Sequence, residues 1–396
     1  MKSLKIGLVL PSTPGYSETF FQTKIAGLQS AGHRVIIFVG TAKPDFSACR
    51  VVLGPGVYQN KVLMALILLL RVMVLFCRVP LRAFRFLQLE RQSGRSWNRA
   101  FENLYLSSHI LPFDLDWLHF GFATMAIRKE NTAKAMNAKI AVSLRGFDIA
   151  IYPVKNPGCY DLLWKRIDKL HTISDDLLDL AYNNGLQSIT PYQKITPAID
   201  IKKFTRTIPI HEKTGQPIRL LTVARLHWKK GLEYTLEALA LLKKSGIDFQ
   251  YTIIGSGEEY ERLIFAAHQY DIKEKVFFAG KMTHKEVKAK LECAGIYIQY
   301  SISEGFCNSV LEAQAMGCLC VVSDAEGLSE NVLHRATGWV VPKRNPTLLA
   351  RQIMEIIQTE GSQLNKIREA AINRVAEKFN LELQKKAFVD FYEKIN

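Results

Sequence analysis

The sequence predicts an α/β protein with two consecutive domains, each built on a doubly wound parallel sheet. Short β-branched runs alternate with longer amphipathic runs, the pattern of parallel strands with helices on both faces of a sheet. The chain has 396 residues, more than one ordinary domain. Of these residues 48% are apolar and only 22% are charged, which suffices for two buried cores and excludes a disordered chain.

The elements of the first half are short apolar runs that end in turns. The first, Lys5–Leu10, leads directly into a turn at 11–15 and is too short for the apolar part of a signal peptide. Further strands are expected at 34–39, 117–120, 140–144, 169–173 and 194–195. A polar connector then extends from 197 to about 217.

A second series of strands and helices follows the connector. Strands are expected at 218–223, 249–254, 276–279, 296–299, 319–323 and 338–341, and helices at 231–244, 258–270 and 285–293. We place the domains at 1–203 and 204–378, with a separate amphipathic helix at 379–396. Ligands bind such sheets at the carboxyl ends of the strands, so functional residues are expected just after strands and the cleft between domains is the default site.

The seven cysteines favour reduced thiols in a cytoplasmic protein. Their number is odd, no C-x-x-C pair is present, and no histidine lies at zinc-binding spacing. No window of 18 uncharged apolar residues exists, so no membrane-spanning helix is expected.

The positive charge of the chain is concentrated in one segment. Lysine and arginine number 52 against 37 aspartates and glutamates, a net charge of +15, and residues 61–99 hold eight of these cations with one acid. Apolar residues recur at helical spacing through 58–92. This pattern indicates docking of 58–99 on an anionic membrane surface. The alternative is a buried helix whose arginines cover its outer side. Nucleic acid is not expected as a partner, because no binding motif accompanies the charge.

The segment 300–317 carries the most informative motif. A turn holds Glu304-Gly305, and a helix is expected to begin around Asn308-Ser309, both good N-cap residues. Amides at a helix N-terminus bind phosphate or sugar oxygens, and Gly305 lets the backbone approach a ligand closely. Glu304 and Glu312 can reach the same ligand, since a carboxylate accepts two sugar hydroxyls. Two isolated glutamates at this spacing are more often structural: the first is a solvated turn residue, and the second stabilises the helix dipole.

Two cations follow another expected strand. Arg225 and Lys230 lie five residues apart after 218–223, where they would flank a diphosphate and neutralise charge that grows on a leaving group. Taken alone, they would be surface charges. The loop Gly255-Ser-Gly257 suits close passage of a base or ribose, but it lacks the third glycine of a dinucleotide fingerprint.

Together these motifs resemble those of the family-four retaining glycosyltransferases, in particular the exopolysaccharide and colanic-acid branch. That family has the GT-B fold of two facing Rossmann-like domains, with a C-terminal helix that crosses back to the first. The matching residues run through 218–345: Val223-Ala-Arg225-Leu, Lys230-Gly231, Gly255-Ser-Gly257, Glu304-Gly-Phe306, Glu312-Ala313, Gly317, Glu330 and Thr337-Gly338. Weaker matches lie at 11–20, 32–35, 119–121, 146–148, 173–174, 197–200 and 380–392.

The resemblance implies a role for each matching residue. Arg225 and Lys230 bind the donor diphosphate, Glu304 contacts the donor sugar near the reacting carbon, and Glu312 binds the nucleotide ribose. Backbone amides after Gly305 hold sugar hydroxyls or phosphate, and the remaining members of the donor site are Phe306, Cys307, Asn308, Ser309, Gly255, Gly257, Glu330 and Gly15. The acceptor side and the catalytic residues of the first domain comprise His119, Asp148, Ser17, Glu18, Arg145 and Gly146.

The sequence departs from the family pattern at several positions. Arg145 stands where relatives often carry a histidine at the reaction centre, which leaves catalysis by the first domain open and makes Arg145 a candidate for an acceptor phosphate. The first loop has Gly15 alone, where many relatives use two glycines against the diphosphate. Cys307 and Cys320 replace a usual proline and Glu326 a usual glycine, and none of these three is expected to supply chemistry.

The implied reaction moves a hexose-type sugar from a nucleoside diphosphate to a hydroxyl of a glycan precursor, with retention at the anomeric carbon. The expected acceptor is polyprenyl-linked and serves cell-surface polysaccharide synthesis at the inner face of the membrane. No cofactor is expected, and no metal, because no D-x-D-like pair follows a strand. Two alternatives remain: a sugar-nucleotide epimerase of the same fold, and a binding protein without catalysis, for which Arg145 is the hint.

Overall fold

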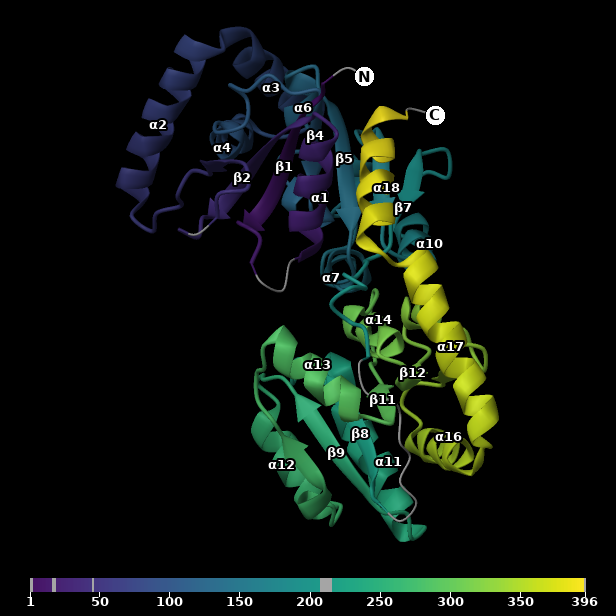
Figure 1. Ribbon diagram of the computed structural model, residues 1–396. Coiled ribbons are helices and arrows are strands. Elements are labelled where there is room, and N and C mark those ends of the chain that lie inside the picture. The colour runs from purple at the N-terminus through teal and green to yellow at the C-terminus, as the bar shows by residue number, and fades with distance from the viewer. Residues whose placement is uncertain (1–2, 16–18, 45, 207–215, 395–396) are drawn as a thin grey trace. The chain divides into compact units, whose positions relative to one another are not determined.

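The structure is a computed structural model that describes residues 3–15, 19–44, 46–206 and 216–394 (Figure 1). The chain forms two compact units. Unit 1 comprises Met1–Ile195 together with Gln384–Asn396, and unit 2 comprises Thr196–Leu383. The end of the chain therefore belongs to the unit in which the chain begins.

Unit 1 is built on a parallel sheet, in which the described residues form seven strands in the order β3-β2-β1-β4-β5-β6-β7. The strands are β1 (Lys5–Ser12), β2 (Arg34–Thr41), β3 (Arg50–Leu53), β4 (Trp117–Phe120), β5 (Lys139–Leu144), β6 (Lys169–Thr172) and β7 (Tyr192–Lys194). The central strands β4 and β5 are buried along almost their whole length, so their sequences are mainly apolar, with His119 and Ser143 as buried polar residues. The sequence did not predict β3, because this short edge strand is only partly buried.

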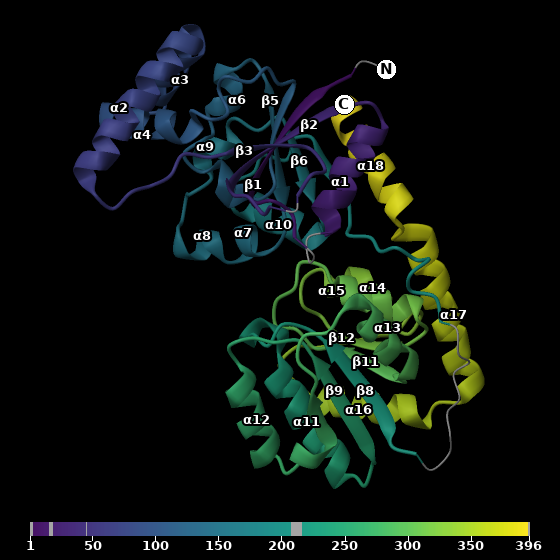
Figure 2. The ribbon, with the colours of Figure 1, turned by 60° about the vertical axis from the view of Figure 1, so that its left-hand side comes forward.

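The helices of unit 1 mostly pack around the sheet, whereas α2 stands apart from it beside α3 and α4 (Figures 1 and 2). They are α1 (Thr19–Ser30), α2 (Lys61–Arg78), α3 (Pro80–Gln92), α4 (Trp97–Ser107), α5 (Ala123–Ala126), α6 (Thr132–Ala135), α7 (Phe147–Ala150), α8 (Tyr152–Lys155), α9 (Asp161–Trp164), α10 (Asp175–Asn183) and α18 (Leu381–Glu393). Helix α18 packs in the core of unit 1 through Phe388, Phe391 and Tyr392. Lys169 Nζ of β6 fixes its end by donating to the carbonyl oxygen of Phe391 at 2.9 Å.

Unit 2 contains a second parallel sheet, whose described strands follow the order β10-β9-β8-β11-β12-β13. The strands are β8 (Ile218–Val223), β9 (Phe249–Ile254), β10 (Val276–Phe278), β11 (Ile296–Gln299), β12 (Leu319–Ser323) and β13 (Trp339–Val341). The helices are α11 (Leu232–Lys244), α12 (Tyr260–Gln269), α13 (His284–Cys293), α14 (Asn308–Ala315), α15 (Leu328–Asn331), α16 (Pro346–Gln358) and α17 (Gly361–Lys378), with short 3-10 helices at Trp228–Lys230 and Lys273–Lys275.

This strand order is that of a Rossmann-like sheet, in which the order reverses on either side of the first strand. In unit 2 the reversal lies between β8 and β11, and in unit 1 between β1 and β4. The prediction of two Rossmann-like α/β units with a C-terminal helix that returns to the first is confirmed. In unit 2 the expected strands at β8, β9, β11 and β12 agree with the structure in both bounds.

The basic segment folds as α2 and α3, which meet at Val79 before Pro80, a residue suited to a helix start (Figure 2). Only Val72 and Leu75 of α2 are buried in the structure as described, whereas Val62 is 81% exposed. The alternative of a buried helix covered by arginines is therefore wrong. None of the helices that the structure describes combines the length and hydrophobicity that a membrane-spanning helix requires.

Candidate functional site

The loops that follow β8 and β11 meet at the reversal point of the unit 2 sheet. Gly231 adopts a φ of +59°, and a Cβ there would lie 2.1 Å from the carbonyl oxygen of Tyr300. The amide of Ile302 donates to the carbonyl oxygen of Lys229 at 2.7 Å. Only glycine permits this approach, so the two loops form one surface at the position where open α/β sheets bind ligands.

Lys230 and Glu304 are in contact on this surface. Lys230 Nζ donates to Glu304 Oε2, and the two side chains are 15% and 16% exposed. Burial is the largest single influence and by itself would lower the pKa of Lys230, but the electrostatic interactions with Glu304 and Cys307 and the hydrogen bond to Glu304 together raise the pKa above its usual value. Lys230 is therefore a cation at physiological pH, and a charge-assisted hydrogen bond fixes its position.

The loop after β11 is held from a distant part of the sequence. The amide of Glu304 donates to Glu326 Oε2 at 2.5 Å. Asn331 of α15 binds both backbone groups of Cys307: its Oδ1 accepts from the Cys307 amide at 3.0 Å and its Nδ2 donates to the Cys307 carbonyl at 3.1 Å. Glu326 has a φ of +24°, in the region that favours glycine, the residue usual in the family at this position. Sequence reasoning missed both residues as parts of the site.

Helix α14 begins at Asn308, and its N-cap is Cys307, whose side chain makes no capping hydrogen bond. The expectation that Asn308 or Ser309 caps the helix is wrong. Ser309 Oγ instead donates to the carbonyl oxygen of Val223 at 3.1 Å, which ties the helix to the end of β8. Phe306 is buried, and its ring lies 5.6 Å from that of Phe379. Because no side chain caps the helix, its first-turn amides suit an anionic ligand.

Gly255 and Gly257, which follow β9, are required by chain packing. A Cβ at Gly255, whose φ is +142°, would lie 1.9 Å from the carbonyl oxygen of Ala224. A Cβ at Gly257 would lie 2.1 Å from that of Leu226. These glycines allow close packing against the loop that carries Arg225 and Lys230. This packing alone explains why glycine is needed at both positions, without contact to a ligand.

The other predicted donor-site residues lie around this centre. Arg225 is exposed at the end of β8. Burial raises the pKa of Glu312 on α14 from 4.5 to about 7, which keeps a proton on a large fraction of this carboxyl group near neutral pH. Glu330 lies on α15, where its carbonyl oxygen accepts from Arg374 Nη2 at 2.7 Å. Gly305 is partly exposed in the loop.

The predicted catalytic residues of unit 1 are buried. His119 on β4 is fully buried, with Ser143 Oγ and Tyr392 Oη each 2.7 Å from its ring nitrogens, and burial holds its pKa well below the usual value. Asp148 on α7 is 1% exposed and accepts from the amides of Ala123 and Arg145, both at 3.0 Å. In this structure both side chains form hydrogen bonds with other residues of unit 1.

Arg145 follows β5 and stacks on aromatic rings. Its guanidinium carbon lies 3.9 Å from the ring centroid of Phe20 and 4.9 Å from that of Phe21, both on α1. Gly146 has a φ of +125°, which sharply turns the chain into α7. Gly15 is buried after β1. Ser17 and Glu18 lie outside the described residues.

The fold places this protein in the GT-B class. Among solved structures, Anabaena Alr3699/HepE in complex with UDP superimposes with a TM-score of 0.73 at 14% identity, over 98% of each chain. Residues 203–374 match the family described as glycosyl transferases group 1. Over 284 residues, 68% of each chain, the sequence is 31% identical to a Salmonella typhimurium protein named as the colanic acid biosynthesis glycosyltransferase WcaL.

A further relative is the N,N'-diacetylbacillosaminyl-diphospho-undecaprenol alpha-1,3-N-acetylgalactosaminyltransferase of Campylobacter jejuni, 26% identical over 246 residues, 60% of this chain and 63% of that protein. The protein described here belongs to the group 1 glycosyltransferase family. The family resemblance drawn from Lys230, Glu304 and the neighbouring motifs is thus confirmed at this level. The assignment to retaining family-four enzymes stays a prediction.

Proposed function

We propose that this protein transfers a hexose-type sugar from a nucleoside diphosphate to a hydroxyl group of a glycan precursor, with retention of anomeric configuration. The observation that carries the proposal is the contact between Lys230 and Glu304 at the reversal point of the unit 2 sheet. A fixed cation beside a carboxylate suits a ligand with a diphosphate at one end and a sugar at the other.

Each residue of the site then has a task. Lys230 and the exposed Arg225 hold the diphosphate, together with the first amides of α14. Glu304 accepts hydrogen bonds from the sugar hydroxyls near the anomeric carbon. Glu312 accepts both hydroxyls of the ribose once it has lost its proton.

The proposed reaction has no covalent enzyme intermediate. The bond between the anomeric carbon and the β-phosphate oxygen breaks, and the acceptor oxygen bonds to that carbon on the same face. The departing phosphate oxygen takes the proton of the acceptor hydroxyl. Lys230 and Arg225 offset the charge that grows on the phosphate, so the proposal needs no metal ion and no cofactor.

In unit 1 we assign the acceptor side to Arg145, Gly146 and the loop at 11–20. His119 and Asp148 take a positioning role here, because both are buried and Asp148 binds the amide of Arg145 at 3.0 Å. Arg145 is the candidate for a phosphate of the acceptor.

The acceptor that we propose is a lipid-linked precursor of a cell-surface polysaccharide. Two features support this: WcaL is named for colanic acid biosynthesis, and the Campylobacter relative is named for a diphospho-undecaprenol acceptor. The exposed apolar side chains of α2, interspersed with cations, suit an anionic membrane surface, so we propose that the protein works at the cytoplasmic face of the membrane through residues 58–99.

A thermal-shift panel of UDP-, GDP- and ADP-sugars tests the donor site. A ligand at about 100 times its Kd adds roughly 2.7 kcal/mol to the free energy of unfolding, so at least one sugar nucleotide should raise the Tm. The Lys230→Ala variant should lose that response, whereas Lys244→Ala, at the exposed end of α11, should retain it. The absence of any response in the unsubstituted protein, or an equal response in the Lys230 variant, would contradict the proposal. Incubation of a binding nucleotide without acceptor separates transfer from epimerisation.

A further inference from the structure

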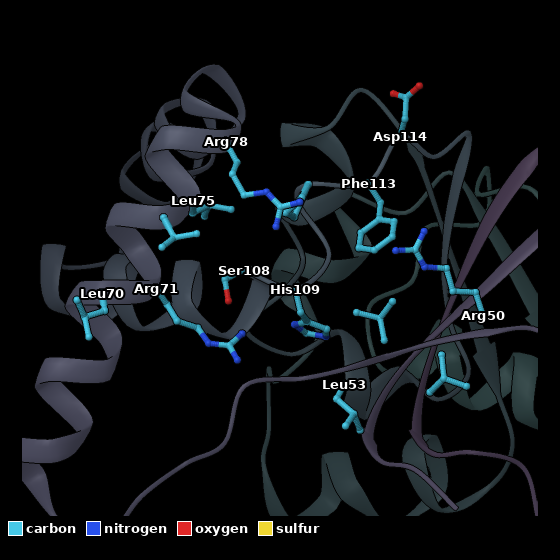
Figure 3. A pocket seen from close by; sticks show the side chains of 14 residues that line it. Arg50, Leu53, Leu70, Arg71, Leu75, Arg78, Ser108, His109, Phe113 and Asp114 are labelled. Carbon is cyan, nitrogen blue, oxygen red and sulfur yellow. The ribbon is translucent and has the colours of Figure 1, made fainter. Parts of the chain in front are cut away.

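Unit 1 contains a pocket that the donor site does not use. It has a volume of about 900 Å³ and lies between strand β3, helix α2 and the segment 108–114 that follows α4 (Figure 3). Arg50 enters it from β3, and Arg71 and Arg78 enter it from α2. Figure 3 shows the three guanidinium groups directed into the same space.

The charge of the pocket is not balanced from within. Across the ranges that the structure describes, no carboxylate pairs with Arg50, Arg71 or Arg78. The one carboxylate in its lining, Asp114, is bound by Lys5 Nζ at 3.1 Å and Arg82 Nη2 at 3.0 Å, and it points away from the three arginines in Figure 3. Three guanidinium groups around one space fit an anion with more than one negative charge.

The floor of the pocket offers further polar groups. Ser108 is 8% exposed, and its hydroxyl group has no hydrogen-bond partner among the described residues. A buried hydroxyl group without a partner is costly, and an anionic oxygen in the pocket would satisfy it. Burial, with the charges of Lys129 and Arg71, lowers the pKa of the adjacent His109 to about 3, so its ring is neutral at physiological pH. A neutral ring still carries one N–H donor.

The rim of the pocket is apolar where α2 borders it. Leu70 and Val74 line the pocket and are 53% and 55% exposed. They continue along α2 into Leu66 and Met73, which are exposed to a similar degree. A soluble anion would leave this apolar surface in water, whereas a ligand with a phosphate at one end and a hydrocarbon chain at the other would cover it.

We propose that this pocket binds the terminal phosphate or diphosphate group of a membrane lipid, whose chain lies against the exposed apolar side of α2. The inference rests on the membrane docking proposed above and adds to it a specific headgroup site. Arg71, Arg78 and Arg50 hold the phosphate oxygens, and Ser108 donates to one of them. General attraction of a basic surface to a bilayer requires none of these groups in particular.

The test measures vesicle binding of the full chain without donor or acceptor. Phosphatidylcholine vesicles carry either phosphatidic acid, which has a terminal phosphate, or phosphatidylglycerol, which has none, and the two preparations are matched for surface potential. The unsubstituted protein should prefer the terminal phosphate by about 30-fold, the product of two added charge contacts of roughly five- to sixfold each. Arg71→Gln/Arg78→Gln should abolish this preference.

Two further variants separate the pocket from general charge. Lys61→Gln/Arg91→Gln removes two cations of the same segment outside the pocket lining, and it should weaken binding to both vesicles while the preference remains. Ser108→Ala changes no charge and breaks no hydrogen bond of the described structure, so a reduced preference with an unchanged Tm would mark a contact to the phosphate.

Three results would overturn the inference: equal binding to both vesicles, an equal loss of preference in the two double variants, or inorganic pyrophosphate binding in the same pocket as tightly as the lipid. The thermal-shift response to sugar nucleotides, recorded with the same proteins, reports on the donor site. If that response persists while the lipid preference is absent, only the headgroup site fails; if the response is absent and the preference is present, the proposed donor chemistry fails instead.

Discussion

Replacing Glu312 with glutamine should stabilise the protein, and the gain should depend on pH. Burial raises the pKa of this carboxyl group from 4.5 to about 7, so the folded protein keeps its proton at pH values where the unfolded chain has released it. Unfolding therefore releases a proton between these two values, and the free energy of unfolding falls as the pH rises through them. At 1.36 kcal/mol per pKa unit, the loss reaches about 3 kcal/mol above pH 7.

Glutamine has the shape of the protonated carboxyl group and never ionises. Glu312→Gln should therefore leave the free energy of unfolding almost unchanged near pH 4 and raise it by about 3 kcal/mol near pH 8. Urea-induced unfolding of the full chain, followed by circular dichroism at several pH values, measures this difference. Glu369→Gln, at an exposed position of α17, removes one carboxylate from the surface and serves as the matched control.

A gain of the same size at every pH, or no gain near pH 8, would refute the reasoning from burial. The same variant also tests the ribose assignment, because glutamine has one acceptor oxygen where a carboxylate has two, and its NH2 group cannot accept a hydrogen bond from a hydroxyl group. Its thermal shift with the binding sugar nucleotide should be smaller than that of the unsubstituted protein. If the stabilised variant binds the sugar nucleotide as tightly as the unsubstituted protein, the argument from burial holds, but the assignment of Glu312 to the donor site is wrong.

Three further predictions concern the loops of unit 2. Glu304→Gln and Lys230→Ala should each lower kcat by at least ~10²-fold, the effect of losing one preorganised charge contact; steady-state transfer assays measure this, and unchanged turnover in both would refute their roles. Gly255→Ala should lower the Tm strongly, because the new Cβ meets a carbonyl oxygen at 1.9 Å, whereas Gly361→Ala, with no atom within 4 Å, should be tolerated. Glu326→Ala leaves the amide of Glu304 without its acceptor, so KM for the donor should rise while unfolding becomes easier by only about 1 kcal/mol, and an unchanged KM would show that the loop is held without it.

The fold could be predicted because its strands are buried on both faces. Strands β11 and β12 are buried along their whole length and are apolar except at their last residue, and β8 and β9 each carry only one exposed residue, Arg219 and Gln250. These mainly apolar runs lie between polar loops, which fixes their bounds in the sequence. Strand β3 lies at the sheet edge and is only partly buried, so hydrophobicity does not distinguish it from a loop. The apolar residues of α2 have the same spacing whether the helix is buried or not, so spacing alone did not exclude the buried alternative, and the cations interspersed among them favoured the exposed helix that the structure contains.

The donor site could be predicted only in part. Lys230 and Glu304 follow adjacent parallel strands, and strand ends that share one edge of a sheet bring their loops together. Glu326 and Asn331 bind backbone groups of this loop from more than twenty residues away, and such contacts depend on where the chain passes after β12. No residue type or spacing in the sequence predicts which side chain will bind a distant backbone amide.

The surplus charge of the basic segment divides into two groups with different physical roles. Arg82 pairs with Asp114 and donates to two backbone carbonyls, and Arg95 pairs with the buried Glu90 and Glu130. Removing a partner from a buried pair such as those of Arg95 costs several kcal/mol, so Arg95 stabilises unit 1, whereas the pair of Arg82 with the 75% exposed Asp114 contributes less.

Arg71 and Arg78 enter the pocket without a carboxylate partner in the described ranges, and their field reaches an approaching anion. Charges that are already neutralised within the protein add little to attraction at the range of the Debye length, about 8 Å in physiological salt. The count of eight cations therefore overestimates the electrostatic attraction between this segment and an anionic bilayer. The affinity for vesicles should therefore decrease less steeply with salt concentration than eight unpaired cations would predict. Only the unpaired cations, chiefly Arg71 and Arg78, exchange their counterions for lipid phosphate.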